Sequence, residues 1–262
     1  VDLTAAVELV TEMEKHGCAI IKHTNPCGAA IGNDTKDAYE KALSCDPVSA
    51  FGGIVAFNSE VDEDTAEKLN EIFLEIICAP SYSDSALEKL KTKKNRRLIR
   101  VKKNLDKDEL TIKSVPGGLL AQEKDNSILD DSMLKYVTER KCSEKKLEDL
   151  KFAWVVCKHT KSNAIVFVKD KKAIGVGAGQ MSRLDSAKIA AMKAKEFGHD
   201  LNGAVAASDA FFPFADGLLE IASHGITAVI QPGGSVRDDE VIKAANEKNI
   251  SMIFTGIRNF KH

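Results

Sequence analysis

The sequence has no CxxC pair: its six cysteines are scattered, and most lie in apolar segments, which favours buried free thiols. It also lacks a strong net charge, because 37 basic and 39 acidic side chains leave a formal charge of −2, so a broad nucleic-acid surface is not expected. No apolar run approaches the roughly 20 residues needed to cross a bilayer, and no signal peptide pattern opens the chain. We therefore expect a cytoplasmic protein that binds neither nucleic acid nor membrane.

A cluster of basic residues is the one exception to this balanced charge. It runs from Lys91 to Lys103, and no aromatic side chains interleave with it, as they do in sites that stack nucleic-acid bases. We therefore interpret it as a solvated helix end and loop.

Metal and dinucleotide signatures are also weak, and no HExxH motif occurs. The segment from His23 to Cys27 is similar to the zinc deaminase pattern, but Asn25 stands where that pattern has its glutamate, and no second cysteine follows at the required spacing. The glycine run 175–179 follows a strand that belongs to a predicted hairpin rather than opening a βαβ unit, so it favours a tight turn. We expect neither zinc nor NAD.

Helix and strand patterns alternate along most of the chain, which predicts βαβ units and a mostly parallel sheet in an α/β protein. In the first part, helices are predicted over 4–16, 35–45, 64–75 and 83–92, and strands over 18–22, 54–57, 76–79 and 98–101. In the second part, helices are predicted over 182–197, 216–224 and 238–249, and strands over 164–168, 173–176, 204–207, 228–230 and 252–254.

A polar, helix-prone segment separates these two parts and predicts a connector over 126–151. The corresponding subdomains are 1–125 and 152–262. Both alternate in the same way, so two similar halves are expected, although no residue-level repeat is strong enough to prove a duplication.

The pair Lys22-His23 lies at the end of the apolar strand 18–22 and runs directly into Asn25-Pro26-Cys27-Gly28. We predict a turn there, because the residue before a proline avoids the helical region and Gly28 permits unusual backbone shapes. Histidine titrates near neutral pH and lysine can hold developing negative charge, so the pair suits proton transfer. A solvated pair at a strand end is the alternative.

Three other segments carry polar or aromatic groups that suit a ligand. Lys158 to Asn163 offers hydroxyl and amide groups for a polar ligand or a weakly hydrated cation, or caps a helix end. Ser208 to Phe214 gathers three of the eleven phenylalanines around a proline and an acid, which suits a flat heteroaromatic ring or a corner of the core. Arg258 suits a phosphate or carboxylate and has Phe260 two residues on, unless this end is frayed.

Together, six stretches dispersed over almost the whole chain resemble the formyltransferase portion of the bifunctional purine biosynthesis proteins, the AICAR transformylase. These stretches are 21–28, 46–53, 161–164, 175–183, 208–214 and 231–240. The resemblance implies a duplicated, cytidine-deaminase-like α/β fold with three-layer α/β/α halves and mixed sheets. It also implies transfer of a formyl group from 10-formyltetrahydrofolate to the 5-amino group of AICAR, giving FAICAR and tetrahydrofolate. The expected assembly is a homodimer with active sites at its interface.

The resemblance further implies roles for individual residues. His23 would transfer protons, Lys22 would stabilise charge, and Asn163 would lie near the reacting amine. The remaining substrate and folate contacts would be Arg258, Phe260, Gly52, Glu75, Phe211, Pro213, Phe214 and Asp216, and a potassium site would use Thr160, Ser162 and Asp209.

Some departures from the family pattern leave alternatives open. The resemblance covers neither a cyclohydrolase domain nor the family segment that would precede Val1 and carry an arginine for the substrate phosphate. Ala215 stands where an arginine is common, and Ala164 stands where some relatives have serine. The alternatives are a purine- or folate-binding module without turnover, a zinc deaminase on the shared fold, and an NAD-binding oxidoreductase.

Overall fold

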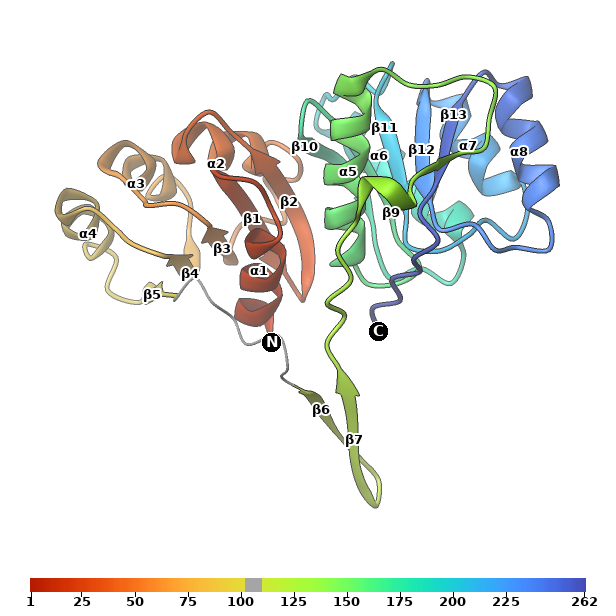
Figure 1. Ribbon diagram of the computed structural model, residues 1–262. Coiled ribbons are helices and arrows are strands. Elements are labelled where there is room, and N and C mark those ends of the chain that lie inside the picture. The colour runs from red at the N-terminus through yellow and green to blue at the C-terminus, as the bar shows by residue number, and fades with distance from the viewer. Residues whose placement is uncertain (102–109) are drawn as a thin grey trace.

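The computed structural model describes residues 1–101 and 110–262, so the predicted first subdomain and the end of the basic run 91–103 lie in part outside the described residues. A mixed sheet of eleven strands runs through the molecule in the order β5-β4-β3-β1-β2-β10-β9-β11-β12-β13-β8 (Figure 1). Only four of its ten strand pairings are parallel. The mixed α/β fold is therefore confirmed, and the expectation of a mostly parallel sheet was wrong.

The predicted helices and strands are all present with shifted ends, but helix 144–158 and the strands 25–31, 110–115, 118–123 and 135–136 were not predicted. The helices are α1 (Asp2–Thr11), α2 (Thr35–Leu43), α3 (Glu63–Leu69), α4 (Asp84–Leu90), the 3-10 helix η1 (Asp131–Met133), α5 (Glu144–Lys158), α6 (Arg183–Glu196), α7 (Asp216–Ser223) and α8 (Asp238–Glu247). The strands are β1 (Gly17–Lys22), β2 (Asn25–Ile31), β3 (Gly53–Phe57), β4 (Leu74–Ala79), β5 (Arg97–Arg100), β6 (Leu110–Val115), β7 (Gly118–Glu123), β8 (Lys135–Tyr136), β9 (Ile165–Lys169), β10 (Lys172–Gly177), β11 (Val205–Ser208), β12 (Ala228–Gln231) and β13 (Ser251–Phe254).

The two halves of the chain repeat one topology. Each has a helix, an antiparallel hairpin, and then three helix–strand units, from α1 to β5 and from α5 to β13. The first hairpin strand of each half, β1 or β9, pairs antiparallel with the strand after the hairpin, β3 or β11. The two strands that follow, β4 and β5 or β12 and β13, extend the sheet in parallel. The duplication that the residues alone did not establish is therefore visible in the order and direction of the strands.

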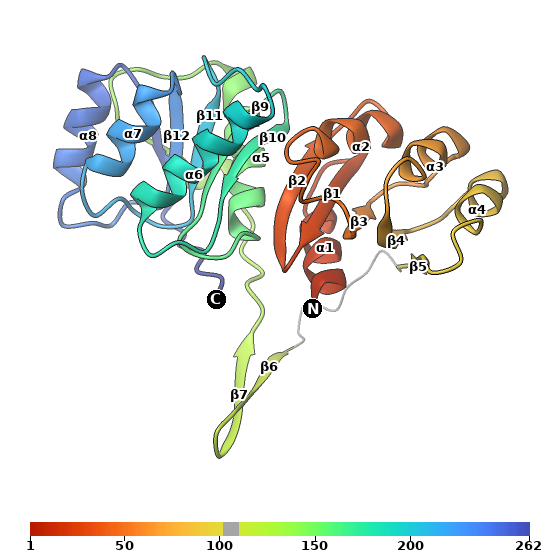
Figure 2. The ribbon, with the colours of Figure 1, turned by 180° about the vertical axis from the view of Figure 1, so that it is seen from behind.

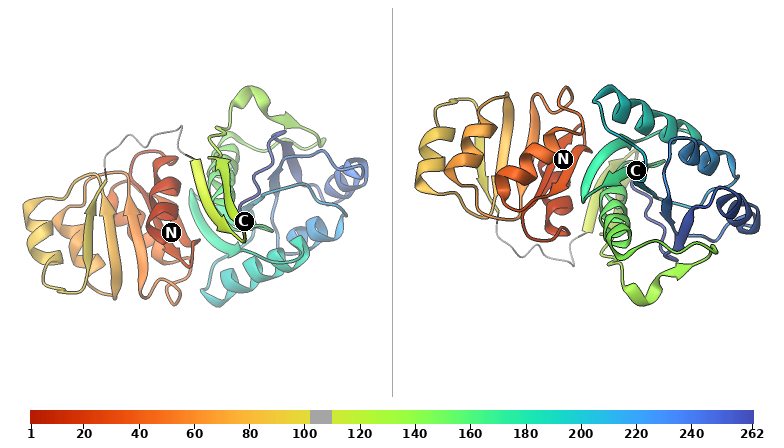
Figure 3. Two further views of the ribbon diagram at one scale, coloured as in Figure 1. Left: turned by 90° about the horizontal axis from the view of Figure 1, so that it is seen from below. Right: turned by 90° about the horizontal axis from the view of Figure 1, so that it is seen from above.

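Helices cover both faces of the sheet in each half. Figure 2 shows α2, α3 and α4 of the first half and α6, α7 and α8 of the second on one face. The helices α1 and α5 lie on the other face (Figure 1), and the views from below and above show the same layering (Figure 3). The halves meet where β2 runs antiparallel to β10, at the pair Ala30 and Lys172.

One glycine in the second hairpin strand of each half lets a helix lie directly on the sheet. A Cβ atom at Gly28 would stand 2.1 Å from the carbonyl oxygen of Ala42 in α2. A Cβ atom at Gly175 would stand 2.3 Å from the carbonyl oxygen of Ala190 in α6. Since no side chain fits at either place, these glycines are needed for close packing rather than for a nucleotide fingerprint.

Two local predictions need correction. The predicted turn at Asn25 to Gly28 is part of strand β2, and the chain turns earlier, at His23 and Thr24, whose φ angles are 49° and 65°. The predicted connector 126–151 divides in two. Its first part holds η1 and β8, whereas its end lies within α5, which packs against β9 and β11 of the second half.

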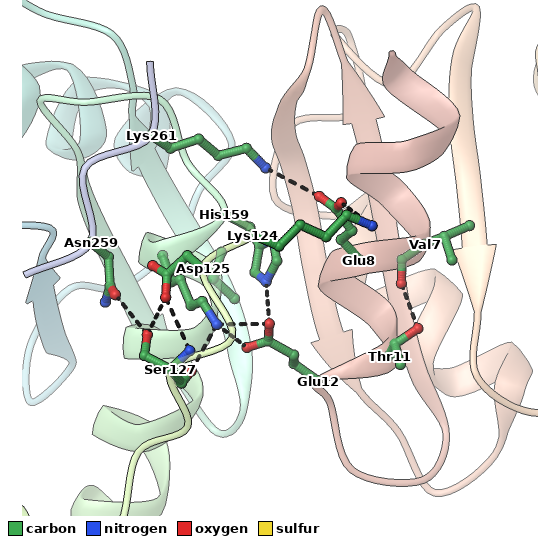
Figure 4. Close-up of polar contacts among 12 residues, drawn as sticks. Val7, Glu8, Thr11, Glu12, Lys124, Asp125, Ser127, His159, Asn259 and Lys261 are labelled. Atoms are coloured by element: carbon green, nitrogen blue, oxygen red, sulfur yellow. Dashed lines mark hydrogen bonds and ion pairs between the residues drawn. The ribbon is translucent and has the colours of Figure 1, made fainter. Parts of the chain in front are cut away.

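A buried polar cluster joins α1 to the end of α5 (Figure 4). Lys158 Nζ lies 2.9 and 3.1 Å from the two carboxylate oxygens of Glu12 and donates to the carbonyl oxygen of Ser127 at 2.8 Å. His159 Nε2 lies 3.1 Å from Glu12 Oε1 but out of line for a hydrogen bond. Burial lowers the pKa of His159 and would raise that of Glu12, but His159 and Lys158 hold the pKa of Glu12 below its usual value. This carboxylate thus neutralises a lysine whose side chain is 3% exposed.

The hairpin of β6 and β7 leaves the body of the molecule as an arm (Figure 1). Every residue of both strands is exposed. The register places Leu110 and Ile112 on the same face as Leu119 and Ala121. The arm therefore presents an apolar face that no described residue covers.

Two buried tyrosines give a matched test of core hydrogen bonding. The Tyr82 hydroxyl lies 2.9 Å from the carbonyl oxygen of Ile77 and 3.0 Å from that of Ile99, whereas the buried Tyr39 hydroxyl has no partner among the described residues. Tyr82→Phe should lower the free energy of unfolding by about 1 to 2 kcal/mol. Tyr39→Phe should leave it unchanged or raise it, because it removes an unpaired polar group. Urea unfolding measures both, and equal losses in the two variants would contradict this assignment.

Candidate functional site

The sheet brings most of the predicted site residues to one edge. The strand pairings place there the C-terminal ends of β1, β10 and β11 and the N-terminal ends of β2, β3, β4 and β9. The predicted site residues at or next to these strand ends are Lys22, His23, Gly52, Glu75, Ser162, Asn163, Asp209 and Phe211. An edge formed by the loops of both halves is a place where ligands bind in α/β sheets.

The Lys22-His23 pair stands on a distorted hairpin. The register of β1 against β2 shifts between Ile20 and Ile21, and His23 is in the left-handed region. Neighbours on a regular strand face opposite sides, yet here both side chains line one cavity of about 240 Å³. His23 is exposed, and Lys22 Nζ donates to the carbonyl oxygen of Phe51 at 2.7 Å. The distortion therefore allows both side chains to reach one ligand.

The same cavity includes residues of both halves, among them Cys27, Asp46 and Lys193. Lys193 Nζ lies 3.3 Å from Asp46 Oδ2 across the junction of the halves. Burial, with a smaller effect of Asp46, raises the pKa of Cys27 to about 12. The raised pKa favours the thiol over the thiolate, which is the nucleophilic form.

Hydrogen bonds tie the His23 turn to α1 of its own half and to the second half. The backbone N–H of Thr24 donates to Asp2 Oδ1 at 3.0 Å, and the backbone N–H of Lys161 donates to Asn25 Oδ1 at 2.9 Å. Asn163 follows Lys161 by two residues. The structure thus brings the predicted proton-transfer residue and the predicted amide into one neighbourhood.

Asn163 is held firmly at this edge. Its Nδ2 donates to the carbonyl oxygen of Gln180 at 2.8 Å, and its own carbonyl oxygen accepts from Ser186 Oγ at 2.8 Å. No hydrogen bond within the described ranges uses Asn163 Oδ1. This oxygen can therefore accept a hydrogen bond from an amine.

Asp209 organises the adjoining polar group. Ser162 Oγ donates to Asp209 Oδ2, while Asp209 Oδ1 accepts from the Ala164 N–H at 3.1 Å and from Arg183 Nη2 at 3.2 Å. Thr160 Oγ1 instead donates to the carbonyl oxygen of Val156 at 2.8 Å. A carboxylate and two hydroxyl groups suit a hard cation, but the arrangement directly joins only Ser162 and Asp209. Over residues 1–101 and 110–262, no group of three or more His, Cys, Asp or Glu side chains could hold a metal ion.

The C-terminal segment lies beside this group rather than fraying. The N–H of Asn259 donates to the carbonyl oxygen of Asp209 at 3.1 Å, and the N–H of Ser162 donates to that of Lys261 at 2.9 Å. The guanidinium of Arg258 lies 4.5 Å from the centroid of the Phe260 ring, and that of Arg183 lies 5.9 Å from it. Two arginines and an aromatic ring are thus placed within reach of an anionic, planar ligand.

The predicted folate-side residues fall into two separate groups. Gly52, at φ 69°, would place a Cβ 3.1 Å from Lys22 Nζ and 3.7 Å from the Phe73 ring. Phe73 lines a second cavity with Glu75 and the basic residues Lys94, Arg96 and Arg97.

The other group follows β11. Phe211 is half-buried, Pro213 and Phe214 are exposed, and Arg237 lies 4.7 Å from the Phe214 centroid. Asp216 begins α7, and its Oδ1 accepts from the Gly217 N–H at 2.7 Å. Phe212 belongs to the core. No hydrogen bond or ring contact among the described residues joins this group to the group around Gly52 and Glu75.

Sequence reasoning missed several residues at this edge, chiefly Asp2, Asn25, Arg183 and Phe73. Asn25 was interpreted as a turn residue and as the position of the missing zinc deaminase glutamate, but not as a contact within the site. Arg183 closes the stretch 175–183 that carries the resemblance, so this stretch was the signal that could have found it. Nothing in the pattern around Asp2 or Phe73 indicated a place at the site.

Comparison with known proteins shows which family the chain belongs to. A family model described as AICARFT/IMPCHase bienzyme matches residues 1–193. The chain belongs to this family. It is 54% identical over 263 residues to the bifunctional purine biosynthesis protein PurH of Chlorobium chlorochromatii, covering all of this chain and 50% of that protein. It is 52% identical to PurH of Persephonella marina and 53% identical to PurH of Aquifex aeolicus, each time over 51% of the relative.

The chain therefore spans about half the length of the curated relatives it matches. Their names connect the family with purine biosynthesis. No helix of the described residues is long and apolar enough to pass through a membrane.

Proposed function

We propose that this chain transfers the formyl group of 10-formyltetrahydrofolate to the 5-amino group of AICAR, giving FAICAR and tetrahydrofolate in purine biosynthesis. One observation carries the proposal. The hydrogen bond from the Lys161 N–H to Asn25 Oδ1 holds the Lys22-His23 turn beside Asn163, so proton transfer, charge stabilisation and amine recognition can act on one substrate.

The roles of the reacting residues follow from the chemistry of the step. Attack of the AICAR amine on the formyl carbon develops an oxyanion and a cationic nitrogen. The imidazole of His23 accepts the proton lost from that nitrogen, and the ammonium of Lys22 stabilises the oxyanion. When the oxyanion collapses, the bond between the formyl carbon and N10 of the folate breaks, and the protonated imidazole returns the proton to N10, which releases tetrahydrofolate and FAICAR. Lys22 has three N–H donors, of which one contacts the Phe51 carbonyl oxygen, so others can serve the substrate. Asn163 Oδ1 accepts from the amine and orients its lone pair.

The binding residues would act around this centre. Arg258 and Phe260 receive the charged and planar parts of AICAR, and Phe211, Pro213, Phe214 and Asp216 receive the folate together with Gly52 and Glu75. Since no hydrogen bond or ring contact among the described residues joins the two folate-side groups, we propose a homodimer in which one copy's group completes the other copy's site. A potassium ion at Thr160, Ser162 and Asp209 would help to order residues 160–163.

Purified chain supplied with AICAR and 10-formyltetrahydrofolate should release tetrahydrofolate, followed by absorbance and by mass spectrometry of FAICAR. Omitting AICAR should remove the signal. Tight AICAR binding by folded protein without product would instead favour the binding module, and bound zinc near equal stoichiometry would favour the deaminase. Reduction or oxidation of a nicotinamide cofactor would favour the oxidoreductase.

A further inference from the structure

The turn that carries His23 is held in an unfavourable backbone shape. His23 and Thr24 are consecutive non-glycine residues with φ of 49° and 65°. Non-glycine residues are strained in this region. Such a turn keeps its shape only where surrounding contacts hold it, and those contacts decide where the imidazole points.

One side chain contacts both sides of the site. Asn25 Oδ1 accepts from the Lys161 N–H at 2.9 Å, and Asn25 Nδ2 lies 3.4 Å from the carbonyl oxygen of His23. Asn163, two residues after Lys161, is itself anchored to Gln180 and Ser186. Asn25 therefore links the His23 turn to the segment that carries Asn163.

The duplicated hairpin shows that this bridge is particular to the first half. The second hairpin also turns through two left-handed residues, Asp170 and Lys171, at φ 54° and 50°. There the Asp149 carboxylate accepts both backbone N–H groups, at 3.1 and 2.7 Å, within its own half. The pairing Lys169 with Lys172 matches that of Lys22 with Asn25, so a lysine stands where the first hairpin has Asn25.

We propose that Asn25 is a positioning residue that sets the His23 imidazole against the Asn163 amide. This inference rests on the proposed formyl transfer. A carboxamide suits the task because it accepts from Lys161 and donates towards His23 at once. Aspartate at this position keeps the acceptor for the Lys161 N–H but loses the donor towards His23. Leucine, of similar size, loses both.

The test compares Asn25→Leu, Asn25→Asp and Asp149→Asn. The last variant is the control, because Asp149 holds the turn of the second hairpin. In Asn25→Leu, kcat should fall by about 10- to 100-fold while KM for AICAR changes by less than about threefold, because orientation rather than binding is lost. Asn25→Asp should retain more of kcat than Asn25→Leu. Asp149→Asn should lower stability and leave kcat unchanged.

A double-mutant cycle separates positioning of His23 from a general structural effect. In a His23→Ala background, with added imidazole to raise the residual rate, Asn25→Leu should cause less than a twofold further loss. A loss that adds in full to that of His23→Ala, or a kcat within twofold of wild type in Asn25→Leu, would overturn the assignment.

Hydrogen exchange gives a readout that does not depend on turnover. The Lys161 amide should exchange about tenfold faster in Asn25→Leu, as expected for loss of one hydrogen bond, and near the wild-type rate in Asn25→Asp. An unchanged Lys161 amide in Asn25→Leu would refute the positioning role even in an inactive chain. Absence of product from wild-type protein with normal Lys161 protection would count against the proposed function instead.

Discussion

His23→Ala should lower the rate of formyl transfer from 10-formyltetrahydrofolate to AICAR by at least about 100-fold, and nearly abolish it. The AICAR amine is a poor nucleophile, because the imidazole ring and the neighbouring carboxamide withdraw its lone pair. Its attack therefore requires removal of a proton as the bond forms, and a positioned general base contributes about 10²- to 10⁴-fold. His23 is the exposed imidazole that lines the cavity shared with Lys22. Initial rates of tetrahydrofolate release measure the loss.

His224→Gln is the matched control for this prediction. His224 caps α7, where its Nε2 lies 3.1 Å from Glu220 Oε1, and it lines neither cavity described above. This variant should keep the wild-type rate. Added imidazole should restore part of the activity of His23→Ala, since the cavity then admits the missing base. A His23→Ala protein with wild-type turnover would remove His23 from the mechanism.

Glu12→Gln should destabilise the fold by about 3 kcal/mol, because it leaves the ammonium of Lys158 buried without a counter-charge. The Lys158 side chain is 3% exposed, and its other contacts carry no negative charge: the Ser127 carbonyl oxygen at 2.8 Å and the Trp154 ring, whose centroid lies 5.9 Å from Nζ. Glu14→Gln is the matched control, since Glu14 pairs with Lys171 at 2.9 Å where the side chains are 62% and 28% exposed. An exposed pair contributes at most about 1 kcal/mol. Urea unfolding of both variants measures the difference, and equal losses would contradict the buried role of Glu12.

The same cluster predicts sensitivity to acid. The pKa of Glu12 is lowered in the folded protein, so its contribution to stability is present above its usual value of 4.5 and is lost as pH falls below it. Burial lowers the pKa of His159 from its usual 6.5, so the unfolded chain takes up this proton first and stability already declines below pH 6.5. Glu12→Gln should flatten the part of the decline below pH 4.5. Unfolding curves between pH 7 and 4 test both parts, and a slope unchanged by the variant would exclude Glu12 as its source.

The sequence predicted most of the elements but missed α5, β2 and the hairpin of β6 and β7, and it did not predict how the strands pair. Apolar runs such as 54–57 predicted buried strands, because burial on both faces leaves a continuous pattern. Strand direction and the duplication depend on long-range pairing, which a local pattern does not contain. Asn25-Pro26 was interpreted as a turn because the residue before a proline avoids the helical region, yet the turn is made by His23 and Thr24. The Thr24 N–H donates to Asp2 and the Lys161 N–H donates to Asn25 beside this turn, and a local pattern contains neither of these long-range contacts.

For the candidate site, the roles assigned from residue chemistry stay predictions, and the structure adds the contacts around them. Asn25 joins the turn of Lys22 and His23 to the segment that carries Asn163, and Asn259, between Arg258 and Phe260, donates to the carbonyl oxygen of Asp209. Of the three clustered phenylalanines, Phe212 is fully buried, whereas Phe214 is 48% exposed, a difference that depends on how β11 enters α7. Periodicity does not distinguish adjacent members of one aromatic run.

The β6–β7 arm affects the tendency of the purified protein to aggregate. Aggregation is promoted by its two open strand edges and by exposed apolar side chains such as Leu119, which is 71% exposed. Light scattering from concentrated samples would therefore report on the arm rather than on the body. Replacing Ile112 and Leu119 with threonine should reduce aggregation without altering the sheet edge that carries His23.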